Sequence, residues 1–159
     1  MIKIVINWSE PIEIFKPKKY NTDEKFIHHF QKFISEIDSP LLEKEGFYCV
    51  VAGSLTPEEK LSTVLIEESF GKSIKEKICR KKGHMREYRC IYKNYGDENI
   101  FIKVGIVESL NVGHSEEVYR KIKCKLIADN SPSCNEPCSV SDTLDIEIIN
   151  TGNYNPLKK

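Results

Sequence analysis

The chain has 159 residues, of which 40% are hydrophobic and 30% are charged. That length is enough for one domain with its own hydrophobic core, and the composition is that of a globular protein. No apolar run approaches the roughly 20 residues that would cross a bilayer, and the start lacks the pattern of a signal peptide. We therefore expect a cytoplasmic protein without a membrane partner.

The charge is balanced overall but unevenly placed along the chain. There are 24 Lys or Arg and 24 Asp or Glu. Residues 71–94 hold nine Lys or Arg and two Glu, a local balance of +7, and residues 111–125 have a local balance of +2. Two interpretations stay open: a basic face that binds a polyanion, or solvated helix surfaces balanced by acidic neighbours.

The predicted elements alternate between strands and helices from the first residue to the last. The apolar spacing predicts strands at 2–7 and 12–15, a helix that Asp23 caps and Ser39-Pro40 ends, and a hairpin of Gly46–Ala52 with Thr63–Glu68. The same reasoning predicts two helices over 72–81 and 86–95, followed by a strand at Ile100–Val107. It then predicts a helix from Ser115 to about Asp129 and a late strand at 144–149.

This order predicts an α+β fold with a small three-stranded antiparallel sheet flanked by helices and with an extra strand at each end. The two end strands are candidates for pairing with each other. We expect a single domain over 1–159, with a core at 46–135 and with 1–45 and 136–159 as extensions packed on it.

Six cysteines, at positions 49, 79, 90, 124, 134 and 138, are expected to be free thiols because the cytosol keeps thiols reduced. Cys49 and Cys124 lie inside apolar patterns and are expected in the core. Cys134 and Cys138 have a spacing that zinc tolerates, and Cys79 with His84 could join them, but no second matching pair exists. We predict no metal site.

Several short motifs then occur in a fixed order. They are Gly46-Phe47-Tyr48, Ser69-Phe70-Gly71-Lys72, Ser73-Ile74-Lys75-Glu76-Lys77-Ile78, Lys123-Cys124-Lys125-Leu126-Ile127, Pro132-Ser133-Cys134-Asn135 and Ile149-Asn150-Thr151-Gly152. Together they resemble a GIY-YIG nuclease domain over roughly residues 46–135. The resemblance implies a three-stranded antiparallel sheet with helices around a phosphodiester-cleaving site.

The resemblance also implies roles for single residues. Tyr48 keeps the first tyrosine of the motif pair. Phe70 stands in place of the second tyrosine and has no hydroxyl, so an acid–base contribution of about 10²–10⁴-fold is lost. Lys77 stands in place of an arginine and lacks the fork that matches phosphate. His84 is the candidate for an assisting histidine.

The later helix and the loop after it carry the other implied site residues. Lys123 stands in place of the glutamate that binds a divalent metal, and an ammonium repels such an ion. Asn135 is kept. Without the metal ligand and the phenol, metal-assisted hydrolysis is not expected. Should the alignment of this helix shift by two turns, Glu116 and Glu117 would be the carboxylates.

Three functions remain open. The first is a nuclease-like domain that has lost catalysis and binds phosphate, DNA or RNA through Lys72, Lys75, Lys77 and Lys123. The second is an active endonuclease with a rearranged site, which alone would need Mg²⁺. The third is a protein-interaction module. Glu67, Glu68 and Glu76 are the carboxylates near enough in sequence to neutralise the lysines, and such pairing would favour the third function.

Single residues also have plain structural interpretations. Tyr48 in an apolar strand is as typical of a core aromatic as of a site residue. Gly71 is typical of a turn. Asn135 after Pro132 is typical of a residue that braces its own loop.

Overall fold

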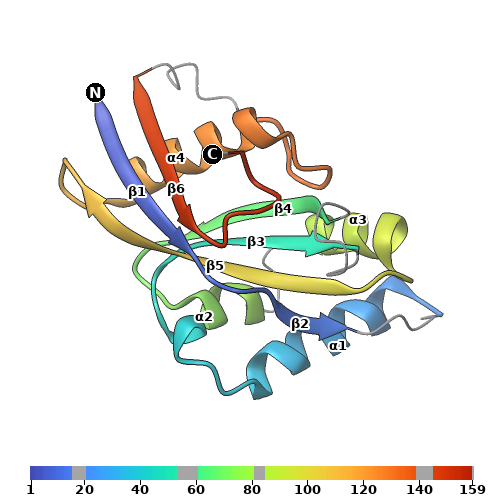
Figure 1. Cartoon of the computed structure of the whole chain (residues 1–159). Helices are drawn as coiled ribbons and strands as arrows, with labels where there is room; N and C mark the ends of the chain where they lie inside the picture. Colours follow the sequence, from blue (N-terminus) through green and yellow to red (C-terminus); the bar gives the residue numbers. More distant parts are fainter. Residues whose placement is uncertain (16–20, 54–60, 81–84, 139–144, 159) are drawn as a thin grey trace.

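The computed structural model describes residues 1–15, 21–53, 61–80, 85–138 and 145–158 (Figure 1). His84 lies outside the described residues. The elements, in chain order, are β1 (Ile2–Trp8), β2 (Ile12–Phe15), α1 (Asp23–Glu36), the 3₁₀ turn η1 (Pro40–Glu43), β3 (Gly46–Ala52), β4 (Ser62–Ser69), α2 (Ile74–Cys79), α3 (Met85–Tyr95), β5 (Ile100–Leu110), α4 (Glu116–Asn130) and β6 (Ile146–Gly152).

The strands form one mixed sheet in the order β4-β3-β5-β1-β6, and β2 pairs with β5 beside β1. Strand β3 is antiparallel to both β4 and β5, which confirms the predicted antiparallel hairpin. Strand β1 is antiparallel to β5, and β6 runs parallel to β1 from the Ile2–Ile146 pair to the Trp8–Gly152 pair. The predicted three-stranded antiparallel set is present, but the sheet is larger than predicted. Strands β1 and β6 join the same sheet, and their parallel pairing makes it mixed.

Both faces of the central strands are covered. Tyr48, Val50 and Ala52 pack into the cluster that contains α1, α2 and α3. Phe47, Cys49 and Val51 pack into the opposite cluster, under α4. A strand buried on both faces has an uninterrupted apolar sequence, which is what residues 46–52 show. Figure 1 shows α4 across one face of the sheet and α1 with α2 across the other.

The helices begin at side-chain caps close to the predicted positions. Ser115 caps α4, since its hydroxyl accepts a hydrogen bond from the Val118 N–H at 3.1 Å. Helix α1 differs by one residue from the prediction. Thr22, not Asp23, is its cap and accepts from the Lys25 N–H at 3.2 Å. Asp23 instead lies in the first turn, where its charge favours the helix dipole.

Four of the six cysteines form disulfides, so the expectation of free thiols is wrong for them. Cys90 is bonded to Cys134 and Cys124 to Cys138. Cys134 and Cys138 have different partners and do not act as a zinc-ligand pair. Sequence spacing could not reveal this, because the loop after α4 packs against α3 and brings together cysteines 44 residues apart. Cys49 is a buried free thiol, as expected.

None of the described helices is both long and apolar enough to cross a membrane.

Candidate functional site

Tyr48, the tyrosine expected to line the candidate site, lies in the interior of the protein. Its side chain is fully buried in the middle of β3. Burial raises the pKa of its phenol well above the usual value, and the neighbouring Tyr88, Glu67 and Glu68 raise it further. The phenol therefore stays protonated at neutral pH and cannot serve as a base. These properties are those of a core aromatic.

Phe70, which the resemblance aligned with a second tyrosine, belongs to the other face of the sheet. It follows β4 and packs edge-on against Tyr119 of α4, with ring centroids 5.2 Å apart. It contacts the cluster under α4, whereas Tyr48 belongs to the cluster on the opposite face. The structure thus does not bring these two aromatic residues into one site.

Lys77 and Lys123, the two lysines that the resemblance placed in the candidate site, both form ion pairs with the end of β4. Lys77 Nζ lies 3.5 Å from Glu68 Oε1, and Lys123 Nζ lies 3.6 Å from Glu67 Oε2. The side chains are 16% and 11% exposed in the first pair and 20% and 5% exposed in the second. We call Glu67, Glu68, Lys77 and Lys123 the edge charge cluster.

Other positive charges of residues 71–94 are paired as well. Lys75 Nζ lies 3.0 Å from Glu43 and donates to the Ile37 carbonyl at 2.9 Å. Arg86 pairs with Glu136 and Arg89 with Asp23. These three carboxylates come from segments outside residues 71–94, and each neutralises one positive charge of that stretch. The interpretation that acidic neighbours balance the charge is the one these contacts support.

A cavity of about 210 Å³ opens next to the Glu67–Lys123 pair. The charged side chains that line it are Glu67, Glu87, Arg120, Lys123 and Glu136. Carboxylates thus outnumber cations in its lining, which does not favour an anion. The sequence could have indicated Arg120, three residues before Lys123 on the same helix face. It carried no signal for Glu87 and Glu136, which come from other segments.

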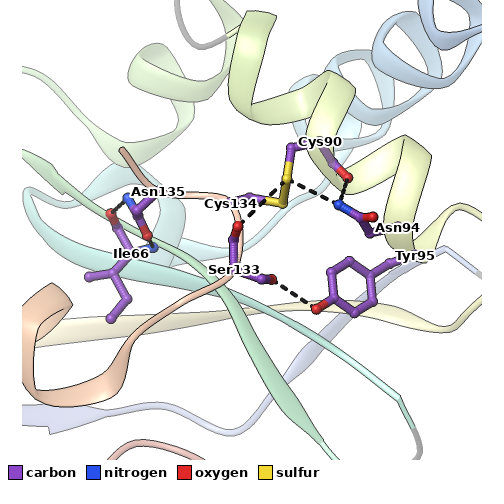
Figure 2. Close-up of a disulfide and its surroundings, with 7 residues drawn as sticks. All are labelled: Ile66, Cys90, Asn94, Tyr95, Ser133, Cys134 and Asn135. Atoms are coloured by element: carbon purple, nitrogen blue, oxygen red, sulfur yellow. Dashed lines mark hydrogen bonds between the residues drawn. A yellow bond between two sulfur atoms is a disulfide. The ribbon is translucent and has the colours of Figure 1, made fainter. Parts of the chain in front are cut away.

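Asn135 also lines this cavity, and its side chain is fully engaged with strand β4 (Figure 2). Its Oδ1 accepts from the Ile66 N–H at 2.8 Å, and its Nδ2 donates to the Ile66 carbonyl at 2.8 Å. The side-chain amide thereby forms the two backbone hydrogen bonds at Ile66 that a neighbouring strand would form. The interpretation of Asn135 as a brace for its loop is confirmed.

The remaining candidates are spread over the surface. Lys72 is half-buried, and its backbone carbonyl accepts from the Ser69 hydroxyl at 2.6 Å. Glu116 and Glu117, the alternative metal ligands, are exposed at the start of α4, and Glu117 pairs with Lys121 at 3.3 Å. Glu76 is exposed on α2. Within the described ranges no group of three or more His, Cys, Asp or Glu is placed to hold a metal ion.

His114 was not among the predicted residues, and it meets the aromatic cluster around Phe70. Its Nδ1 lies 2.8 Å from the Tyr119 hydroxyl, and Tyr119 stacks on Phe47 with centroids 5.1 Å apart. Burial raises the pKa of the Tyr119 phenol, and Glu45 raises it further. The imidazole–phenol contact joins the residue before the N-cap of α4 to the first turns of that helix, and Tyr119 in turn packs against Phe70, which follows β4. No motif in the sequence pointed to this contact.

The titration of Glu67 provides a direct test of the edge charge cluster. Burial raises the pKa of its carboxyl, Lys123 and Lys77 lower it, and Glu87 and Glu68 raise it again. The net effect is that the pKa of the Glu67 carboxyl is raised. A carboxyl whose folded pKa is raised stabilises the fold below its unfolded pKa, and this contribution is lost as the pH rises through the folded pKa.

We therefore expect Glu67→Gln to gain stability relative to the natural protein as the pH rises from about 4 to about 7, the range above the usual carboxyl pKa. Urea unfolding at both pH values measures this, with Glu116→Gln, an exposed site, as the matched control. If the natural protein gained stability over Glu67→Gln with rising pH, the ion pair with Lys123 would outweigh the cost of burial and the prediction would be wrong.

The fold and the site define an α+β domain whose sheet edge carries two internal ion pairs. Comparisons of the chain with protein-family models, with curated proteins and with solved structures gave no match.

Proposed function

We propose that this protein is a GIY-YIG-like domain without nuclease activity, which acts as a binding module. The observation that carries the proposal is the ion pair between Lys123 and Glu67. An ammonium on α4 occupies the position that the resemblance assigns to a metal-binding carboxylate, and its partner is a buried glutamate of β4. A tethered cation at this place disfavours a divalent ion, since two like charges in one poorly solvated site repel each other.

The arrangement of elements supports the GIY-YIG part of the proposal. The antiparallel set β4-β3-β5, the helices α2 and α3 between β4 and β5, and α4 after β5 follow the order that the resemblance implies. The separation of Tyr48 from Phe70 supports the loss of catalysis, because no shared site holds a phenol that could exchange a proton with a water molecule.

The partner we favour is another protein. Lys75, Lys77 and Lys123, three of the four lysines expected to bind anions, are each paired with a carboxylate. A lysine that is already neutralised releases few counterions from a nucleic acid and contributes little to affinity for phosphate. Phosphate or nucleic-acid binding is the second candidate. It is favoured by Lys72 and Arg120, for which the described part of the chain offers no ion-pair partner.

A cytoplasmic location belongs to the same proposal. Disulfides in cytosolic proteins of ordinary organisms are mostly transient and respond to redox conditions. The two disulfides near the site would then be regulated bonds rather than permanent ones.

We expect the purified protein not to cleave plasmid or short duplex DNA in the presence of Mg²⁺ or Mn²⁺. The physical reason is the absence of an oxygen ligand at Lys123 and of a hydroxyl at Phe70. Gel analysis of the products over a range of protein concentrations checks this. Cleavage that is abolished both by EDTA and by Glu117→Ala would contradict the proposal and would move the metal site two turns along α4.

The same preparation distinguishes the two kinds of partner. Titration of a labelled duplex and a labelled single strand at low and moderate salt measures any affinity for phosphate. Salt-dependent binding that is lost in Lys77→Ala/Lys123→Ala, but kept in the control Lys121→Ala/Lys125→Ala, would establish the nucleic-acid candidate. The control removes the same charge from two half-buried lysines of α4, each of which pairs with an acidic residue four positions away on that helix. Binding that is absent at low salt leaves a protein partner.

A further inference from the structure

The loop that follows α4, residues 131–138, covers the outer edge of the sheet. Strand β4 is at the end of the strand order. The Cys134 N–H donates to the Val64 carbonyl at 2.8 Å, and Asn135 forms its two hydrogen bonds with the Ile66 backbone. The loop therefore satisfies backbone groups that an uncovered edge strand would offer to another chain. We call residues 131–138 the edge loop.

The edge loop is bonded covalently to a helix on each side. Cys134 is bonded to Cys90 of α3, and Cys138 to Cys124 of α4. Figure 2 shows the first bridge directly beside the contact of Asn135 with Ile66. Both disulfides of the described chain thus fasten one short segment.

Apart from its hydrogen bonds to β4 and its buried residues, the edge loop makes polar side-chain contacts that lie close to solvent. The Ser133 and Tyr95 hydroxyls share a hydrogen bond of 2.8 Å. Glu136 and Arg86, whose side chains are both exposed, form an ion pair. Pro132 and Cys134 are buried, whereas Ser133, Glu136 and Pro137 are exposed. Such contacts compete with water and hold a loop weakly without a covalent tether.

Each of the two bridges joins one half-buried cysteine to one buried cysteine. Cys90 and Cys138 are half-buried, while their partners Cys134 and Cys124 are buried. Each bridge therefore has one cysteine near the surface, and thiolate attack on a disulfide needs an accessible sulfur.

We propose that the edge loop is a thiol-controlled latch on β4. In the oxidised protein the loop covers the edge of β4 at Val64 and Ile66 and walls the cavity beside Glu67 and Lys123. Reduction of both bridges by a dithiol releases the loop and leaves this backbone edge open to pair with an extended segment of another chain.

The chemistry balances for each bridge. A thiolate of the dithiol attacks one sulfur, forms a mixed disulfide and expels the other cysteine as a thiolate. The second thiol of the reductant then attacks the mixed disulfide, closes into the oxidised cyclic form and releases the remaining cysteine. Two electrons pass to the protein, and two protons convert the cysteine thiolates to thiols.

Hydrogen exchange tests the latch in the natural protein. Amide exchange is measured by NMR before and after reduction with dithiothreitol, and intact mass confirms the number of thiols. We expect exchange of the Ile66 and Cys134 amides to accelerate at least about tenfold on reduction, as for a local opening, while amides of β1 and β3 keep their rates. In the oxidised protein, Asn135→Ala is expected to accelerate Ile66 alone.

Matched variants assign the effect to the bridges. Cys90→Ser/Cys134→Ser and Cys124→Ser/Cys138→Ser each remove one tether, and both are expected to show part of the acceleration without reductant. Cys79→Ser changes a free, half-buried thiol and is expected to behave like the natural protein. Three results would overturn the latch: six free thiols in protein purified without reductant, unchanged Ile66 exchange after complete reduction, or an equal acceleration in every strand.

Discussion

Gly46→Ala is expected to destabilise the protein by about 3 kcal/mol or more, or to prevent folding, because overpacking and backbone strain act together at this residue. Gly46 begins β3 with a φ of +145°, a conformation that residues with a side chain rarely adopt. A Cβ atom there would lie 2.5 Å from the carbonyl oxygen of Gly105 in β5. This oxygen belongs to the backbone of the central sheet and cannot turn away.

Urea unfolding of Gly46→Ala and of the control Gly113→Ala measures the effect. Gly113 lies in a surface turn, and a Cβ there would meet no atom within 4 Å. The control is expected to change stability by less than about 0.5–1 kcal/mol. Equal effects of the two substitutions would show that strands β3 and β5 do not approach each other as described. The first motif glycine therefore has a packing role that does not depend on catalysis.

Lys103→Met is expected to cost about 3 kcal/mol or more, since it removes a buried charge from three half-buried acceptors and leaves them without their donor. Lys103 lies in the middle of β5 and is only 1% exposed. Its ammonium donates to the Asn153 carbonyl at 2.8 Å, to the Asn153 side-chain oxygen and to the Asn155 carbonyl. An ammonium has three N–H groups, so these contacts use its full capacity.

In Lys103→Met, the segment around Asn153 is expected to lose part of its contact with β1 and β5. Asn153 N–H donates to the Trp8 carbonyl at 2.9 Å, and the Trp8 indole donates to Asn150 at 2.8 Å. Trp8 is the single tryptophan of the chain, so its fluorescence reports on this region. Urea unfolding followed by fluorescence checks the prediction, with Lys3→Met, an exposed lysine of β1, as control. A loss no greater than that of the control would contradict the role assigned to Lys103.

Much of the secondary structure could be predicted from the sequence. The apolar run of 46–52 and its partner at 63–68 predicted the hairpin that β3 and β4 form. Ser115 predicted the start of α4. These features depend on the period of the apolar residues and on short-range capping, which a single segment encodes by itself.

The candidate site was predicted only in part. The sequence indicated Glu67 and Glu68 as carboxylates that could neutralise lysines, because they end the strand next to the motif. The structure pairs them with Lys123 and Lys77. It also separates Tyr48 from Phe70. Side-chain directions at the end of a strand depend on how the sheet meets its helices, and this information is not local.

By itself, the sequence determined the class of fold, the order of the elements and the nature of the residues near the end of β4. The tertiary structure alone decided that β6 joins β1 in parallel, that Cys90 meets Cys134, and that acidic residues from distant segments pair with Lys75 and Arg89. The physical reason is the same in each case. Hydrogen bonding within a helix and the alternation of a strand are set by near neighbours, whereas strand order, disulfide pairing and ion pairing join residues whose approach depends on the packing of the whole core.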